Sequence, residues 1–519
     1  MPNHRNADCR RCSYPAMHRR ESPTKSFEGS AFEKRFFSRS HSSQTAEFIF
    51  GKDYIWFKRW PEFFRRRLAI SSTHNWVVTT DISTFFDNVH YGHLRNIIST
   101  LDGIEEVVLD ILFDVVDEIS WRPDYLPSVG IGLPQVQFDA PRLLAHIYLY
   151  EIDQFLKKET ADSFVRWVDD ITFAVDSHVE GKTILRDLDA LLQLRGVRLN
   201  SGKTSVLSKL DARRFFHGRA NEFLDRMKSR IDDKQKLGFS TNSLSKRLRS
   251  SFDSFVAQPA YGHHDKVCKR YVGLFGKIGD NYAIDFCTDA LITQPGFRDT
   301  VYRYALDIGP QTKLYSAFIS YVKSPHALDD ASICQIALVL TLWRISPKSS
   351  RFRALAKLGV DLGDPQFTSK SHYYFVASLW LVAKYGTQKN LREVLEKNET
   401  LWSNSEFLSR QVAASAGKFR NERSFKWIAL KIERHGFRSA VSVINSLREL
   451  QEYENNIPGH IRLYCTNGNN VGKYSIQRFL ISFRVLTSKK LKPSVKQNLK
   501  SQIIRFVNDP HYARVLNSL

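Results

Sequence analysis

Cysteine is scarce in this sequence, with six in 519 residues, and most of the six stand alone. A chain of this size with so few cysteines has no disulfide framework, and we expect a reducing, cytoplasmic setting. Long apolar runs are also missing, since residues 333–343, one of the longer runs, are about half as long as a membrane span requires. The first residues are polar and lack the apolar core of a signal peptide. These absences predict a cytoplasmic protein without a membrane partner.

Acidic residues are the minority charge. Asp and Glu number 54 against 76 Lys and Arg, which gives a formal net charge of +22 and a pI near 9.6. An excess of this size favours a polyanionic partner, either nucleic acid or an anionic membrane. Hydrophobic residues make up 42% of the chain and aromatic residues 13%, which is enough for packed cores. The length predicts two to four domains.

The most informative stretch is residues 164–173, which read FVRWVDDITF. Asp169 and Asp170 stand between apolar and β-branched residues, and this pattern predicts a strand–turn–strand hairpin with the acids at its tip. Adjacent carboxylates repel each other unless a cation lies between them, and Mg²⁺ takes oxygen ligands of this kind. By itself, an Asp-Asp pair is also typical of a solvated turn.

Three further motifs surround this pair in the sequence. A β-branched strand at residues 76–80 ends in Asp81, and an acid at the end of a buried strand usually binds a cation or a base. Residues 130–135 form a glycine–proline loop, and the helical pattern of residues 143–155 follows it. A strand and turn later contain Asn200 and Lys203. Two-metal nucleotidyl transfer requires bridging carboxylates, and it benefits from a cation near the departing pyrophosphate.

In this order the motifs resemble the palm of the reverse transcriptase superfamily. The family's first metal motif, an Asp followed by two aromatic residues and a second Asp, matches residues 81–87. Its Leu-Pro-Gln motif matches residues 133–135, its aromatic-x-Asp-Asp motif with a preceding Arg matches residues 166–170, and its later Asn and Lys match Asn200 and Lys203. The resemblance covers about residues 50–220.

The resemblance implies a catalytic and metal-binding set. Asp81, Asp169 and Asp170 would hold two Mg²⁺ ions, with Mn²⁺ as an alternative. Lys203 would assist the departure of pyrophosphate. The implied activity is that of an RNA-directed DNA polymerase, a nucleotidyltransferase that uses dNTPs.

A second set of residues is expected to bind substrate. Phe86 stands where the family places the aromatic residue that blocks a ribose 2′-hydroxyl, although a core phenylalanine is the alternative. Gln135 belongs to the loop that holds the pairing base, and Asn200 belongs to the later motif. Lys58 and Arg59 lie in a basic and aromatic stretch that predicts either a phosphate-contacting surface with stacking groups or an amphipathic helix.

Some positions differ from the family pattern. Val136 replaces the usual Gly after Pro-Gln, Val168 replaces a small residue before Asp-Asp, and Trp167 stands where Tyr is common. These changes surround the template and nucleotide pocket. All three metal-binding acids are present.

Residues 132–153 and the basic-aromatic lead-in are similar to bacterial defence-associated reverse transcriptases, including the abortive-infection type. Some members of that group synthesise DNA without an added template and prime it from a protein hydroxyl, whereas others copy a dedicated noncoding RNA. Both alternatives stay open here. The implied partners are dNTPs, an RNA template or DNA product, a noncoding RNA or second defence protein, and other subunits in a homo- or hetero-oligomer.

The sequence is compatible with two other functions. An element-mobility enzyme of group II intron or retron type is the alternative polymerase. However, no Val-Thr-Gly follows Lys203 and no Cys/His endonuclease pattern is present. A nucleic-acid-binding scaffold without catalytic activity is the alternative from another class, and the three intact acids argue against it.

The expected fold is α+β: right-hand polymerase fingers and palm with an antiparallel sheet, then an all-α helical-repeat (HEAT-like) C-terminal domain. Helical segments after residue 310 pair with a period of roughly 35–40 residues, typical of helical-hairpin solenoids. Their tail, residues 484–505, has five lysines and no acid. We expect a flexible basic arm at 1–45, fingers and palm at 46–220, a thumb-like helical region at 221–310, and the repeat domain with its basic tail at 311–519. Met17 is an alternative start of the chain.

Overall fold

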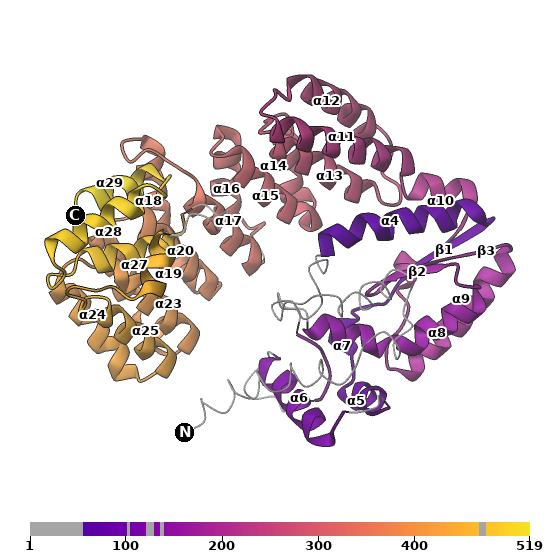
Figure 1. Cartoon of the computed structure of the whole chain (residues 1–519), viewed down its shortest axis with the longest axis horizontal. Coiled ribbons are helices and arrows are strands. Elements are labelled where there is room, and N and C mark those ends of the chain that lie inside the picture. Colours follow the sequence, from indigo (N-terminus) through magenta and orange to yellow (C-terminus); the bar gives the residue numbers. More distant parts are fainter. Residues whose placement is uncertain (1–55, 101–103, 121–128, 135–139, 328, 467–473) are drawn as a thin grey trace. The chain divides into compact units, whose positions relative to one another are not determined.

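The computed structural model describes residues 56–100, 104–120, 129–134, 140–327, 329–466 and 474–519, with the backbone alone for 56–61. The predicted arm at residues 1–45 lies outside the described residues. The described chain forms two compact units (Figure 1). The first takes in the residues up to Glu222 with Ala260–His264, and the second contains Phe223–Pro259 and Asp265–Leu519.

A four-stranded antiparallel sheet lies at the centre of the first unit. Its strands follow the order β2-β3-β1-β4, with β1 between β3 and β4. The strand bounds are β1 (Trp76–Asp81), β2 (Phe164–Trp167), β3 (Asp170–Val175) and β4 (Ser205–Ser208). The middle of β1, residues 77–80, is buried, which explains why this strand reads as a continuous run of β-branched residues.

Successive side chains of the strands point to opposite faces of the sheet and contribute to two different cores. On one face, Val77 and Ala174 pack with Phe63 of the helix α4 (Trp56–Thr73). On the other face, Val78 and Phe173 join a larger core built with the helices that follow β1 and β3. The sheet is therefore covered on both sides, with α4 and α10 on one side and α8 and α9 on the other (Figure 1).

The helices of the first unit begin and end at recognisable signals. In α9 the side chain of Ser177 accepts a hydrogen bond from the backbone N–H of Glu180, whose own side chain accepts from the N–H of Ser177, a capping box. Gly181 lets this helix approach the sheet, because a Cβ there would lie 3.1 Å from Val78 and 3.3 Å from Val175.

The remaining elements are η1 (Phe86–Asn88), α5 (Tyr91–Ser99), α6 (Glu106–Ile119), α7 (Ala140–Tyr148), α8 (Tyr150–Glu159), α9 (His178–Leu194), η2 (Ser201–Lys203), α10 (Lys209–Phe215) and α11 (Gly218–Lys236), which continues into the second unit.

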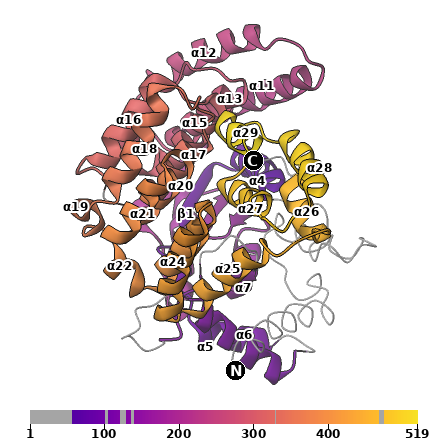
Figure 2. The ribbon, with the colours of Figure 1, turned by 90° about the vertical axis from the view of Figure 1, so that its left-hand side faces the viewer.

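In its described residues, the second unit consists of helices. Helix α20 is buried on nearly all sides and lies against α17 and α18 (Figure 2). One continuous apolar core extends from α20 to α29. The elements are α12 (Asn242–Val256), α13 (His264–Lys277), α14 (Ile284–Thr293), η3 (Pro295–Phe297), α15 (Arg298–Ile308), α16 (Thr312–Lys323), α17 (Asp330–Leu342), α18 (Ser350–Leu362), α19 (Pro365–Thr368), α20 (His372–Tyr385), α21 (Gln388–Lys397), α22 (Glu399–Ser403), α23 (Glu406–Ser415), η4 (Ala416–Lys418), α24 (Glu422–His435), α25 (Arg438–Glu449), α26 (Gly459–Thr466), α27 (Ile476–Leu486), α28 (Pro493–Ile504) and α29 (Pro510–Asn517).

Two lysines, Lys384 buried and Lys418 half-buried, bind backbone carbonyls at helix ends in this unit. Lys418 donates to the carbonyls of residues 382, 383 and 386, at 2.9, 2.7 and 2.6 Å, where α20 ends. Lys384 donates to the carbonyls of residues 341 and 343 at the end of α17, and it pairs with Asp509 at 2.6 Å. Since the last carbonyls of a helix have no partner within the helix, these ammonium groups satisfy them inside the core.

The structure confirms the predicted α+β class in its coarse form, a small antiparallel sheet within a mostly helical chain. The fingers and palm, the HEAT-like repeats and the four predicted domain ranges remain predictions. In the described part of the chain, no helix has both the length and the apolar character needed to span a membrane.

Candidate active site

The three predicted metal-binding acids meet at one end of the sheet. Asp81 is the last residue of β1 and stands directly opposite Asp170, the first residue of β3. Asp169 precedes β3 in the turn, where its carbonyl accepts a hydrogen bond from the N–H of Ile82 at 3.2 Å. Because cross-strand partners point to the same face, Asp81 and Asp170 lie on the α4 side of the sheet. The antiparallel pairing thus joins acids that are far apart in the sequence.

A two-residue turn presents the Asp-Asp pair. Trp167 pairs with Asp170, so Val168 and Asp169 are the two central residues of the turn. The predicted strand–turn–strand hairpin is present, but only Asp169 lies at its tip, because Asp170 is already the first residue of β3. Val168 has a φ of +55°, and it is the only central residue with a positive φ, which matches the φ signs of a type II′ turn. A β-branched residue in this region is strained by roughly 1–3 kcal/mol, so surrounding contacts must hold it there.

A buried ion pair provides those contacts. Arg166 and Asp153 are fully buried, and Arg166 forms a two-pronged pair with the carboxylate, with Nε 2.6 Å from Oδ1. Arg166 also donates to the carbonyl of Val168 at 2.8 Å and lies 3.1 Å from Nδ1 of His146. Arg166 therefore connects the carbonyl of Val168 to Asp153 of α8, and this connection holds the strained turn in place. The sequence did not single out Asp153, whose buried carboxylate supports this turn through Arg166.

Lys203 and Asn200 both contact Asp81. The ammonium of Lys203 lies 2.9 Å from Oδ2, and the side-chain amide of Asn200 donates to the same oxygen at 3.3 Å. The N–H of Asn200 also donates to the carbonyl of Asp81 at 2.7 Å, which ties the turn before β4 to the end of β1. The pKa of Lys203 is raised, first by its hydrogen bond to Asp81 and then by the charges of the acids, so it is an ammonium at neutral pH.

Arg67 of α4 contacts the third acid. Its guanidinium Nη2 lies 2.9 Å from Oδ1 of Asp170, and its side chain is 1% exposed. The guanidinium also stands over the rings of Phe63 and Phe216, at 4.3 and 5.2 Å from their centroids. For this part of the chain the sequence predicts either a phosphate-contacting surface with stacking groups or an amphipathic helix, and the structure has the helix α4 with Arg67 buried. The signal for the burial of Arg67 is its i, i+4 spacing from Phe63 on the apolar face of a helix.

Asp169 is the acid left without a cationic neighbour at bonding distance. Among the described residues, Asp81 pairs with Lys203 and Asp170 with Arg67, whereas Asp169 forms no ion pair. Burial and the nearby charge of Asp81 raise the pKa of Asp169 from 3.8 to about 6, and Asp170 contributes in the same direction. In the described chain, no three acid, His or Cys side chains are already gathered closely enough to enclose a metal ion.

The donor set nevertheless suits a hard divalent cation. Carboxylate oxygens from a strand end and a hairpin tip are the ligand type that Mg²⁺ prefers. The raised pKa of Asp169 shows that its negative charge is insufficiently compensated by the protein alone. Asp81, Asp169 and Asp170 therefore fit the predicted metal site in chemistry, and their role as ligands remains a prediction.

Of the predicted substrate-binding residues, the structure describes the side chains of Phe86 and Asn200. Phe86 is half-buried, its ring packs on Phe85 at 5.6 Å between centroids, and its carbonyl accepts a hydrogen bond from the N–H of Leu133 at 2.7 Å. This bond brings the glycine–proline loop next to Phe86, and Gly132 permits it by adopting a φ of +98°. Gln135 lies outside the described residues. The side chains of Lys58 and Arg59, which belong to α4, are outside them too.

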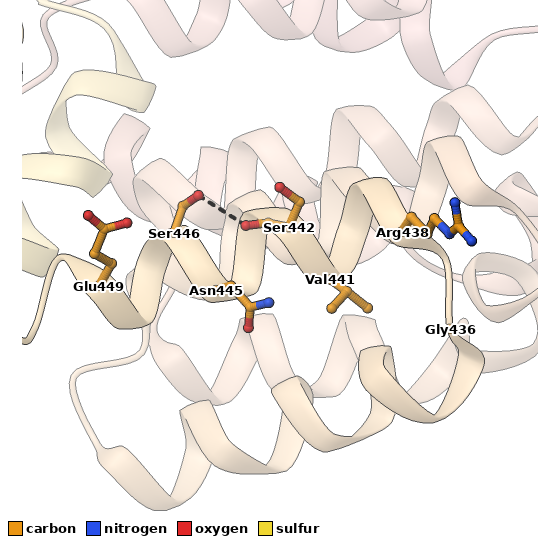
Figure 3. Close-up of a pocket in the computed structure, with 7 residues that line it drawn as sticks. All are labelled: Gly436, Arg438, Val441, Ser442, Asn445, Ser446 and Glu449. Carbon is orange, nitrogen blue, oxygen red and sulfur yellow. Dashed lines mark hydrogen bonds between the residues drawn. The ribbon is translucent and has the colours of Figure 1, made fainter. Parts of the chain in front are cut away.

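A shallow surface depression lies on the second unit, along the outer face of α25 (Figure 3). Its lining is mostly exposed, and within it Ser446 donates to the carbonyl of Ser442 at 3.0 Å. The lining includes none of the acids of the sheet. It also has no nucleophile beside a base, so we assign it no chemistry.

Part of the chain matches a known protein family. Residues 30–223 match the family model described as reverse transcriptase (RNA-dependent DNA polymerase). This stretch carries a reverse transcriptase domain. The match includes the whole sheet, the three acids, Asn200 and Lys203, and it confirms the resemblance at the level of that domain. No curated protein matches the chain. The domain indicates RNA-directed DNA polymerase-like nucleotidyl transfer, with dNTPs and a nucleic-acid template as substrates and divalent metal ions in general use.

Proposed function

We propose that this protein is a reverse transcriptase-type DNA polymerase that acts in bacterial defence against phage. The observation that supports it best is the convergence of Asp81, Asp169 and Asp170 at one end of an antiparallel sheet. Two of these acids have cationic partners within the protein, and the third has a raised pKa. Such an arrangement is expected where a site awaits additional positive charge.

The acids hold the cations and the surrounding residues keep the acids in place. Asp81, Asp169 and Asp170 would hold two divalent ions, whose charge would favour ionisation of the 3′-hydroxyl and offset the charge of the triphosphate. Asp169 offers its carboxylate from a turn that the buried pair of Arg166 and Asp153 fixes. Asn200 orients the carboxylate of Asp81 through its side-chain amide. Preorganisation of this kind lowers the cost of reaching the reactive geometry.

Lys203 is proposed to act on the leaving group. Its side chain is 65% exposed, so the ammonium can leave Asp81 when other cations compensate that carboxylate, and reach the pyrophosphate. We expect Lys203→Ala to slow the chemical step about 10²–10⁴-fold in single-turnover measurements. Rescue by Lys203→Arg would show that charge is sufficient, because arginine does not release its proton. An unchanged chemical step in Lys203→Ala would restrict Lys203 to the basic surface.

The helical second unit is proposed to guide nucleic acid. Lys492 directly precedes α28, Lys496 and Lys500 follow at intervals of four residues on that helix, and we call the three the α28 cation row. Burial and the charges of Arg420 and Lys500 lower the pKa of Lys496, so these cations lie near one another. Within the described residues none of the row pairs with an acid, whereas Lys490 pairs with Glu452. Unpaired cations in a row favour contact with a phosphate backbone.

The defence role and the choice of template depend on the resemblance of residues 132–153 to defence-associated enzymes. DNA synthesis without a template, primed by a protein hydroxyl, and copying of a dedicated noncoding RNA both fit that group. Partners of the same group would include a second defence protein or further copies of the chain. A plaque assay with the wild type and a variant lacking the acids tests the defence role, since protection must disappear with the acids.

The polymerase activity itself has a direct test. Purified protein is incubated with Mg²⁺ or Mn²⁺ and labelled dNTPs, with and without RNA and DNA templates. The variant Asp169→Ala/Asp170→Ala is expected to abolish incorporation and to keep the fold, whereas Asp176→Ala, an exposed acid after β3, keeps activity. Incorporation by the double variant would contradict the assignment. Absence of incorporation in the wild type under every condition would favour the scaffold function.

A further inference from the structure

The guanidinium of Arg67 is built into the interior directly beside one of the two adjacent acids. Only 1% of the Arg67 side chain is exposed, whereas the next residue of α4, Arg66, is 33% exposed and lies 3.6 Å from Asp162. A buried arginine is costly unless its charge is compensated. The described ion pair that compensates Arg67 is the one with Asp170.

The surroundings of Arg67 restrict where its charge can lie. Phe63 and Phe216 place their rings 4.3 and 5.2 Å from the guanidinium carbon, on the α4 side of the sheet. Phe63 also packs against Trp167, with 5.6 Å between ring centroids, and Trp167 is the strand partner of Asp170. Rings, guanidinium and strand therefore form one packed set that fixes the guanidinium relative to the first residue of β3.

We infer that Arg67 is a positioning residue for the metal site, which holds Asp170 in place and thereby gives the two adjacent acids different roles. Asp170 is tethered through Oδ1 to a fixed counter-ion. Asp169 forms no ion pair among the described residues, so its carboxylate is not held by a cation of the protein. This inference rests on the proposed function, since it concerns the binding of a divalent ion to the same acids.

The consequence is that loss of Arg67 weakens metal binding through Asp170. The contact between Arg67 and Asp170 is an ion pair, since Nη2 of Arg67 forms no hydrogen bond within the described residues. A residue that holds a metal-ligating carboxylate in place supports the bound ion, and its removal lowers metal affinity about 10–100-fold. Arg67→Met removes the charge and keeps much of the volume. Arg67→Lys keeps the charge as a single ammonium without the planar fork, so it should restore the affinity in part.

The test is a measurement of Mn²⁺ affinity by the electron paramagnetic resonance signal of free Mn²⁺, with the full chain and no nucleotide. Arg67→Met is expected to bind Mn²⁺ about 10–100-fold more weakly than the wild type. The control Arg66→Met, at the neighbouring position of α4, is expected to keep wild-type affinity. Equal losses in the two variants, or no loss in Arg67→Met, would overturn the inference.

A double-mutant cycle with Asp170→Asn separates positioning from general support of the fold. If Arg67 acts through Asp170, then Arg67→Met causes no further loss of Mn²⁺ affinity in the Asp170→Asn background. A further loss of the same size in that background would show a merely structural role. The double variant also removes both charges together, which favours folding over either single change.

Failure of the proposed function is recognised separately. If the wild type binds Mn²⁺ and Asp169→Asn abolishes that binding, the metal site stands, and the Arg67 variants decide the positioning role alone. If the wild type binds no Mn²⁺, or if Asp169→Asn binds it with wild-type affinity, the metal site and the role of Arg67 are both refuted.

Discussion

Replacement of Asp169 by Asn should make the metal-free protein more stable while it abolishes polymerisation. Burial and the charge of Asp81 raise the pKa of Asp169 from 3.8 to about 6, so its ionised form is disfavoured in the folded state. A pKa difference of this size corresponds to roughly 3 kcal/mol in the free energy of unfolding. Because the side chain is partly exposed and solvent screens part of the repulsion, we expect a gain of about 1–3 kcal/mol. Asn has a similar shape and no charge to suppress.

The pH dependence follows from the direction of the shift. A carboxyl with a raised pKa contributes stability below pH 4, where it is protonated in both states, and loses that contribution as the pH rises through 6. The advantage of Asp169→Asn over the wild type should therefore be fully developed at pH 8. It should shrink progressively as the pH approaches 4.

The assay is thermal unfolding in EDTA at pH 8 and pH 4.5. A gain of 1 kcal/mol corresponds to about 2–4 °C for a unit of this size. The matched control is Asp176→Asn, an exposed acid just beyond the other end of β3. Mg²⁺ should raise the Tm of the wild type and leave that of Asp169→Asn unchanged. A variant no more stable than the control at pH 8, or an advantage that does not change with pH, would refute the reasoning.

Three other predictions follow from the same unit and its helical neighbour. Arg166→Met leaves the buried carboxylate of Asp153 without its guanidinium and should lower the free energy of unfolding in urea by about 3–5 kcal/mol. The control Arg195→Met breaks the half-exposed ion pair with Glu151 and should lower it by under about 1 kcal/mol. Equal costs would contradict the fixing role of the buried pair. Phe86→Ala should admit ribonucleotides if the ring blocks a 2′-hydroxyl, and unchanged discrimination between dNTP and NTP in primer extension would indicate a packing role. Replacement of the α28 cation row by Gln should reduce the salt slope of single-strand binding by about 2, since each phosphate contact contributes about 0.7, whereas Lys490→Gln should not change it.

The local features of the site were predictable because they depend on short stretches of sequence. The β-branched run before Asp81 and the apolar residues around Asp169 and Asp170 specify strands joined by a turn, and the structure has them, with Asp170 in β3 rather than in the turn. The contact between Asp81 and Lys203 needed family resemblance, since only the sheet order brings these residues together.

Other features, a helix break and two buried charged residues, depend on tertiary packing and could not be predicted from the sequence. Residues 143–155 read as one helix, but the structure breaks it at Leu149, which has a φ of −98° and a ψ of 13°, between α7 and α8. Apolar periodicity continues through such a break because the residues on both sides are buried. Arg67 and Asp153 were missed for a related reason. A charged residue reads as a surface residue until its buried partner is known.

The ion pair between Lys384 and Asp509 has a consequence for shortened forms of the chain. Asp509 is 4% exposed and caps α29, while Lys384 lies in the middle of the helical core. Terminal residues are usually dispensable, because few contacts hold them. Here, deletion from residue 509 onwards would leave the ammonium of Lys384 buried without its carboxylate, a loss of about 3–5 kcal/mol. A truncated protein or a premature stop codon in this region should therefore yield an unstable helical unit, although only a small fraction of the sequence is missing.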